Sequence, residues 1–109
     1  MDAEIFKRRT KAFALRVIQL VEALPSSRAT EVFARQLLRS GTSVGANYRA
    51  ACRAKSRADF IAKMGIVEEE CDEAVYWMVL LKQILLMNGS FTAALMAEAN
   101  EILAMVIVS

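Results

Sequence analysis

Basic residues gather in two short stretches of this sequence that could bind phosphate groups. One stretch lies near the start of the chain, at residues 7–11, and the other spans residues 49–57. Clustered cations release counterions when they neutralise phosphates, which is the main source of nucleic-acid affinity. We assign seven residues to a candidate nucleic-acid-binding surface: Arg8, Arg9, Lys11, Arg49, Arg53, Lys55 and Arg57.

Histidine is absent from the chain, which removes much of enzymatic and metal chemistry. The sequence cannot form a histidine-based catalytic triad, a histidine zinc site or the Glu-x-x-His motif of di-iron bundles. Ser40 and Ser43 have no general base at a suitable spacing. Glu69, Glu70 and Glu73 share one acid-rich stretch without partners elsewhere, which disfavours a metal site. We predict a protein that is not an enzyme and uses no metal, cofactor or small-molecule substrate.

The composition predicts a single small helical domain over residues 1–109. Hydrophobic residues make up 56% of the chain and charged residues 24%, which excludes a disordered protein. One proline and four glycines are too few for a turn-rich β fold. A mean hydropathy of +0.33 is high for a monomer, and we interpret the surplus as a subunit interface. A merely apolar small domain is the alternative.

Four periodic segments predict helices over residues of about 4–24, 28–54, 57–87 and 91–108. Pro25 ends the first, because proline cannot continue the hydrogen-bond ladder. Ser56 is an N-cap signal, with Asp59 in the first turn, and Asn88-Gly89 is a C-cap signal. Short connections imply antiparallel neighbours. The predicted fold class is therefore all-α, an antiparallel up-down-up-down four-helix bundle.

The third and fourth helices have distinct apolar patterns. The third has a regular seam, Phe60, Met64, Val67, Cys71, Ala74, Met78, Leu81 and Leu85. The fourth is apolar almost all round, so we expect it to be buried on most sides. If the chain folds back at about residue 89, Ser109 lies level with Glu69. The face around Phe60, Met64 and Val67 then lacks a fourth helix, and another subunit is expected to cover it.

The second helix carries glycines and a polar stripe. Gly41 and Gly45 either weaken it or let a neighbouring helix approach closely. Gln36, Ser40, Ser43 and Asn47 share one face, where polar groups are costly unless hydrogen-bonded. We interpret the stripe as an inter-helix or inter-subunit polar network, with a ligand site that includes Arg39 as the alternative.

Ion pairing is the alternative to phosphate binding for some of the cations. Residues 1–63 have a net charge of +8 and residues 64–109 one of −6. In the expected bundle Arg39 lies level with Asp72, and Arg8 and Arg9 lie near Glu68, Glu69 and Glu70. One positive rim is still expected near one end of the bundle, offset locally by Asp2, Glu4 and Asp59. Its cations are Arg8, Arg9, Lys11, Arg49, Arg53, Lys55, Arg57 and Lys63. An exposed basic turn is nevertheless often only a solvated helix end.

The sequence predicts a cytoplasmic protein with free thiols. The longest uncharged stretch, Gln83–Ala97, is broken by Asn88-Gly89-Ser90 and is shorter than the roughly 18 residues of a membrane span. The N-terminus is amphipathic rather than a signal peptide. Cys52 and Cys71 are expected to lie roughly 18 Å apart along the bundle, because each residue adds about 1.5 Å, so no intrachain disulfide is expected.

Two stretches resemble motifs of the bacterial four-helix bundle proteins encoded in intervening sequences of large-subunit ribosomal RNA genes. The first is residues 36–47, QLLRSGTSVGAN, and the second runs from Ser56-Arg57-Ala58-Asp59-Phe60 to residues 69–77, EECDEAVYW. Gln36, Arg39, Ser40, Ser43 and Asn47 match the first motif, and Glu70, Asp72, Glu73 and Trp77 match the second. Ala50-Ala51 departs from the acid often found there, and we expect no nucleic-acid contact from a charged tail after the fourth helix.

The resemblance implies a left-handed bundle assembled as a ring-like homopentamer. Relatives include accessory proteins of diversity-generating retroelements, whose basic surface binds a reverse transcriptase and nucleic acid. Two functions follow as expectations. The first is a non-enzymatic homo-oligomeric accessory protein that binds RNA, or a complex of nucleic acid and protein, through its basic end. The second is a protein-only scaffold whose charges serve subunit pairing.

Overall fold

The computed structural model describes residues 2–87 and 89–107, and these fold into four α-helices without strands. The helices are α1 (Ala3–Ala23), α2 (Arg28–Ala51), α3 (Arg57–Leu85) and α4 (Ser90–Ile107). The all-α fold class expected from the sequence is confirmed. The second and third helices end three and two residues earlier than expected, and residue 108 lies outside the described residues.

Side-chain caps explain where the first three helices begin. The Asp2 carboxylate accepts from the backbone N–H of Glu4 at 2.9 Å, and Ser27 and Ser56 cap α2 and α3 in the same way. The end of α3 differs from the expectation. Its left-handed capping residue is Leu86, with φ of 52°, rather than the Asn88-Gly89 pair. Leu86 is 80% exposed, so it caps the helix without joining the core.

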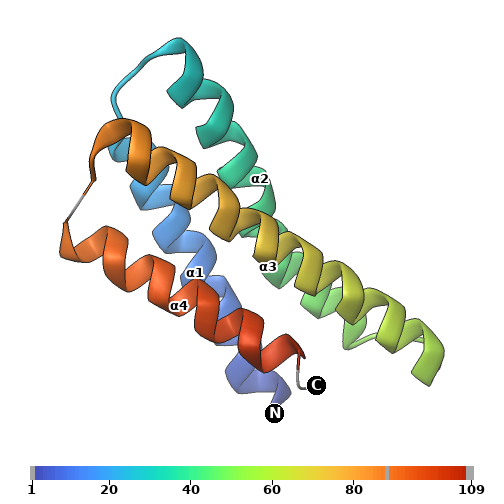
Figure 1. Cartoon of the computed structure of the whole chain (residues 1–109). Helices are drawn as coiled ribbons and strands as arrows, with labels where there is room; N and C mark the ends of the chain where they lie inside the picture. The colour runs from blue at the N-terminus through green and yellow to red at the C-terminus, as the bar shows by residue number, and fades with distance from the viewer. Residues whose placement is uncertain (1, 88, 108–109) are drawn as a thin grey trace.

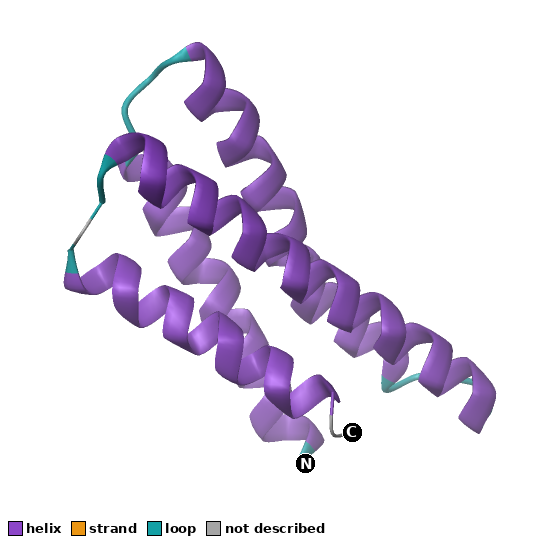
Figure 2. Cartoon of the chain, viewed as in Figure 1, coloured by secondary structure: helices purple, strands orange, loops and turns teal. Residues whose placement is uncertain are grey.

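Consecutive helices run antiparallel, and α4 returns to pack against α1 as well as α3 (Figure 1). Both ends of the described chain therefore lie at the same end of the bundle. The α2–α3 hairpin projects beyond α1 and α4 (Figure 2), which gives the molecule an elongated shape of 44 × 24 × 19 Å. The second basic stretch lies on this projecting hairpin.

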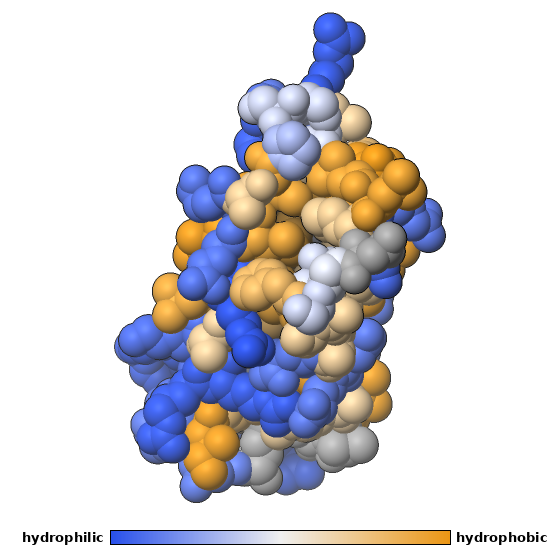
Figure 3. All heavy atoms as spheres, turned by 90° about the vertical axis from the view of Figure 1, so that its left-hand side faces the viewer, coloured by the Kyte–Doolittle hydropathy of each residue, from blue (hydrophilic) through white to orange (hydrophobic). Residues whose placement is uncertain are grey.

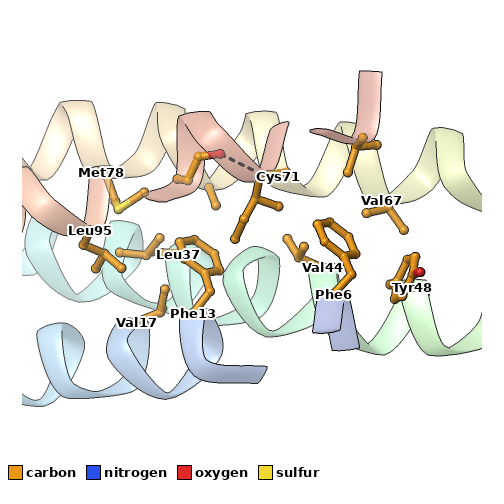
Figure 4. Packing of buried hydrophobic residues seen from close by; sticks show 14 of the residues in the cluster. Phe6, Phe13, Val17, Leu37, Val44, Tyr48, Val67, Cys71, Met78 and Leu95 are labelled. Carbon is orange, nitrogen blue, oxygen red and sulfur yellow. Dashed lines mark hydrogen bonds between the residues drawn. The ribbon is translucent and has the colours of Figure 1, made fainter. Parts of the chain in front are cut away.

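The core fills the space between the four helices (Figure 4). Phe6 and Phe13 of α1 are fully buried, as are Leu37 of α2 and Met78 of α3. The predicted seam of α3 is buried at Met64, Val67, Cys71, Ala74, Met78 and Leu81, while Phe60 and Leu85 are partly buried. The regular spacing of this helix thus identified its core face correctly.

The expected register between α3 and α4 is wrong. The Cys71 thiol donates to the backbone carbonyl of Ala99 at 3.4 Å (Figure 4), whereas folding back at residue 89 would have placed Cys71 level with Ile107. Because Ala99 lies beside Cys71, α4 reaches further down α3 than expected. Met64 and Val67 are consequently buried within the chain and do not require another subunit to cover them.

The expectation that α4 is buried on most sides is also wrong. Only one stripe of it is buried, Thr92, Leu95, Ala99, Ile102 and Val106, because the helix contacts only α1 and α3. Phe91 and Ile107 are 45% and 61% exposed. By length and composition alone α4 would suffice to cross a membrane, a test that core helices also pass. Much of its apolar surface thus faces outward.

Helix α2 approaches α1 closely at Gly41 and Gly45, as one of the two interpretations of these glycines predicts. A Cβ atom at Gly41 would lie 2.9 Å from Cγ2 of Val17, and one at Gly45 would lie 3.2 Å from Oγ1 of Thr10. Val17 is fully buried and β-branched, so it has little freedom to move aside. The glycines therefore set the distance between the two helices.

Gly41→Ala is expected to lower the free energy of unfolding by about 1 kcal/mol, because overpacking outweighs the gain in helix propensity. The matched control is Gly65→Ala in α3, where nothing lies within 4 Å of the added Cβ. This control should raise stability by about 0.5–1 kcal/mol. Urea unfolding of the two variants measures both changes. Equal stabilisation by Gly41→Ala and Gly65→Ala would contradict the close approach of α2 to α1 at Gly41.

The two cysteines are free, as expected, and their thiols should differ sharply in reactivity. Cys52 is exposed, whereas Cys71 is fully buried. Burial, aided by the nearby Asp72 carboxylate, raises the pKa of Cys71 to about 12. Because the thiolate is the nucleophile, native protein should react with iodoacetamide at Cys52 alone, and at both cysteines once unfolded. Mass spectrometry of the labelled peptides measures this. Rapid native labelling of Cys71 would show that the core opens.

Candidate nucleic-acid interface

Three of the predicted cations meet in a groove between α1 and α2. Arg8 and Lys11 contribute from α1 and Arg49 from α2, and the groove has a volume of ≈ 340 Å³. Between the cations its walls are formed by small residues, among them Thr42, Gly45 and Ala46. Two predicted stretches, about 40 residues apart in the sequence, are thus brought together by the antiparallel packing of α1 and α2.

A second groove of ≈ 490 Å³ lies beside it, between α2 and α3. It is lined by Arg49 of α2, Arg53 of the turn after α2, Lys63 of α3, and the small residues Ala46 and Ala50. Because Arg49 and Ala46 line both grooves, the two form one continuous surface across α2. We call this surface the basic groove. The cations expected from the sequence that line it are Arg8, Lys11, Arg49, Arg53 and Lys63.

Most cations of the basic groove have no acidic partner. Within residues 2–87 and 89–107, no ion pair involves Arg8, Lys11, Arg49 or Arg53. Lys63 is the exception, since its Nζ lies 2.6 Å from Oδ1 of Asp59. The hydrogen bond from Lys63, and a second from the Lys55 backbone N–H, lower the pKa of Asp59. Among the described residues, none of the other four cations is held in a direct ion pair, although Glu4 lines the groove between α1 and α2.

Arg9 must be removed from the predicted binding surface. Its guanidinium binds Glu98 of α4 through two hydrogen bonds of 2.8 Å, and it lies 2.6 Å from Glu101. The hydrogen bonds from Arg9 hold the pKa of Glu98 below its usual range, and those to Glu98 and Glu101 raise the pKa of Arg9. The expected pairing with the acids of α3 is also wrong. Arg9 instead joins α1 to α4 through ion pairs with Glu98 and Glu101.

Lys55 and Arg57 lie at the α2–α3 turn, where both are exposed. Neither lines the basic groove. The Lys55 backbone N–H donates to the Asp59 carboxylate at 3.0 Å, which fixes the turn. These two cations extend positive charge along the projecting hairpin, but the structure does not bring them together with Arg8 and Lys11.

Lys7 also lines the groove between α1 and α2, together with Glu4. Lys7 is not among the seven cations predicted from the sequence. It lies one helical turn before Lys11, so the i, i+4 spacing of the two lysines was the available signal. The Lys7 Nζ lies 3.4 Å from the Glu4 carboxylate, which partly offsets its charge.

A second polar cluster joins α2 to α3. Arg39 binds the carboxylates of Glu70 and Glu73, and its Nε donates to Gln36 at 3.3 Å. The indole N–H of Trp77 donates to the same Glu73 carboxylate at 3.0 Å. Asp72, the partner expected for Arg39, is exposed and lies outside the cluster. Arg39 thus forms ion pairs, as the alternative to phosphate binding predicts, but its partners are Glu70 and Glu73 rather than Asp72.

The predicted polar stripe of α2 does not form an inter-helix network. Ser40 donates to the carbonyl of Gln36 at 2.8 Å, Ser43 to that of Arg39 at 2.6 Å, and Asn47 to that of Ser43 at 2.8 Å. Such bonds to the carbonyl one turn earlier satisfy a polar side chain without a partner on another helix. Only Gln36 takes part in the cluster around Arg39.

The chain matches the family model of the 23S rRNA-intervening sequence proteins over residues 2–108. The chain belongs to this family. A crystal structure of a protein of unknown function from the S23 ribosomal protein family of Bacteroides thetaiotaomicron is also similar. It has a TM-score of 0.85 and 36% sequence identity, and the match covers 94% of each chain. No curated protein matches the chain. Membership of the intervening sequence protein family agrees with the resemblance carried by the two motifs.

Proposed function

We propose that this intervening sequence protein is a non-enzymatic, cytoplasmic accessory protein that binds RNA through the basic groove. The observation that carries the proposal is a set of four groove cations that form no ion pair with any residue the structure describes: Arg8, Lys11, Arg49 and Arg53. The chain pairs other cations with acids, at Arg9 and Arg39. Unpaired cations lining one groove are suited to phosphate oxygens, which accept charge-assisted hydrogen bonds.

We also propose that the protein is a homo-oligomer, with a ring-like pentamer as the assembly implied by the resemblance. Large apolar side chains remain exposed in the single chain, including Ile5, Leu15, Ile61, Ile66, Tyr76, Ile84, Leu86, Phe91 and Ile107. Figure 3 shows one face on which apolar side chains gather in the upper part of the view, toward the end where α1 connects to α2. Apolar patches of this kind are common in subunit interfaces.

A protein-only scaffold is the second candidate, and the ion pairs favour it. Arg9 with Glu98, and Arg39 with Glu70 and Glu73, show that charge in this chain can serve helix pairing. In this alternative the basic groove contacts an acidic polypeptide. A reverse transcriptase, the protein partner implied by the resemblance, is compatible with either candidate.

Light scattering with an absorbance ratio tests the proposed function on protein purified without nuclease. We expect an oligomer that carries RNA at low salt and loses it at high salt, because phosphate contacts weaken as salt rises. A clean oligomer without nucleic acid at either salt would favour the protein-only scaffold. A 12.1 kDa monomer would contradict the proposed assembly.

A further inference from the structure

We infer that the basic groove receives the two sugar–phosphate backbones of double-helical RNA, rather than the bases of a single strand. The inference rests on the proposed function and names the form of RNA that the groove takes. The cations of the basic groove lie on both sides of α2.

The cations form two rows separated by one helix. Arg8 and Lys11 lie on the α1 side of α2, where Lys7 and its partner Glu4 also line the groove. Arg53 lies on the α3 side with Lys63, which is paired with Asp59. Arg49 lines both grooves. An α-helix with its side chains is about 10–12 Å across, so the two rows are separated by roughly that width. A double helix presents two phosphate backbones side by side, whereas a single strand presents one. Two rows of cations therefore match a duplex.

The residues between the cations allow close approach but offer no surface for base stacking. The uncharged lining residues are Thr10, Ala14, Thr42, Gly45, Ala46 and Ala50. Proteins that bind single strands stack bases on aromatic side chains, and among the described residues the lining of these two grooves contains none. The exposed Tyr76 and Phe91 belong to other parts of α3 and α4. Duplex RNA is recognised through its shape, phosphates and 2′-hydroxyls, which this lining suits.

Fluorescence anisotropy with two matched RNAs tests the inference. One probe is a duplex of about 20 base pairs, longer than the ~16 that a known duplex-binding module spans. The other is an oligouridylate with the same total number of phosphates. We expect the duplex to bind at least about tenfold more tightly, because only the duplex engages both rows. Equal or tighter binding of oligouridylate would overturn the inference and leave the proposed function standing. Binding of neither RNA would overturn the proposed function itself.

Variants at Arg49 test whether binding of duplex RNA depends on the basic groove. Arg49→Glu should weaken duplex binding about tenfold, whereas Arg49→Lys should retain it to within about threefold, because a phosphate contact requires charge rather than a bidentate fork. Arg49 is exposed, and a circular dichroism spectrum of each variant verifies its helix content. Unchanged duplex binding by folded Arg49→Glu would overturn the placement of the backbones in this groove.

Discussion

Simultaneous replacement of Arg49 and Arg53 with glutamate is expected to reduce affinity for structured RNA at least about 100-fold at low salt. Both side chains line the groove between α2 and α3, and neither has an acidic partner among the described residues. Two reversals change the local charge by four units, so contacts between cations and phosphates become repulsive. Helix content should be unaffected, since Arg49 is exposed on α2 and Arg53 is exposed in the turn that follows it. Anisotropy titration with a labelled RNA hairpin measures the loss.

The control for this experiment is a double reversal elsewhere on the same helix. Arg28 and Arg35 are also exposed residues of α2, and neither lines the basic groove. Arg28→Glu with Arg35→Glu makes the same change in net charge, and should reduce affinity no more than about tenfold through the overall field. Equal losses for the two double variants would show that binding depends on net charge and not on this groove.

Arg9→Glu is expected to lower the free energy of unfolding by about 3 kcal/mol. In the native protein Arg9 and Glu98 are only 25% and 18% exposed, so their charges are partly removed from water and depend on each other. Glutamate at this position would leave three carboxylates together, with Glu98 and Glu101. Because α4 contacts only α1 and α3, we expect its packing against α1 to fail first.

Urea unfolding measures this loss, and a charge swap serves as its control. Arg9→Glu combined with Glu98→Arg restores opposite charges and should recover part of the stability. Since the pKa of Glu98 is lowered in the folded state, its contribution is present above its usual pKa of 4.5 and is lost as the pH falls through the lowered pKa. Arg9→Ala should therefore weaken the acid dependence. An unchanged acid dependence would contradict the role of this pair.

Much of the fold could be predicted because the relevant signals are local. Pro25 and the cap at Ser56 mark helix boundaries, and the spacing of Met64, Cys71 and Met78 identifies the core face of α3. The register of α4 could not be predicted in this way. It depends on the path of the connection after Leu86, and helical periodicity contains no information about that path.

The candidate site was predictable as a set of cations but not residue by residue. Arg8 and Arg9 are neighbours in sequence, yet successive residues of a helix point about 100° apart. Arg8 consequently faces the groove beside α2, and Arg9 faces Glu98 on α4. The acids of α4 lie about 90 residues away, so only tertiary packing reveals which arginine they neutralise. The inter-helix form of the polar network was not found, because Ser40 and Ser43 bond to carbonyls of their own helix.

Lysine protection shows whether RNA occupies the basic groove. Lys11 lies in the groove between α1 and α2, whereas Lys82 lies on α3 beside α4. We predict that saturating duplex RNA protects Lys11 from acetylation by a soluble reagent at least about fivefold, because phosphates cover its ammonium group, and leaves Lys82 unchanged. Quantitative mass spectrometry reads both sites in one sample. Equal acetylation of Lys11 with and without bound RNA would show that RNA does not occupy the basic groove.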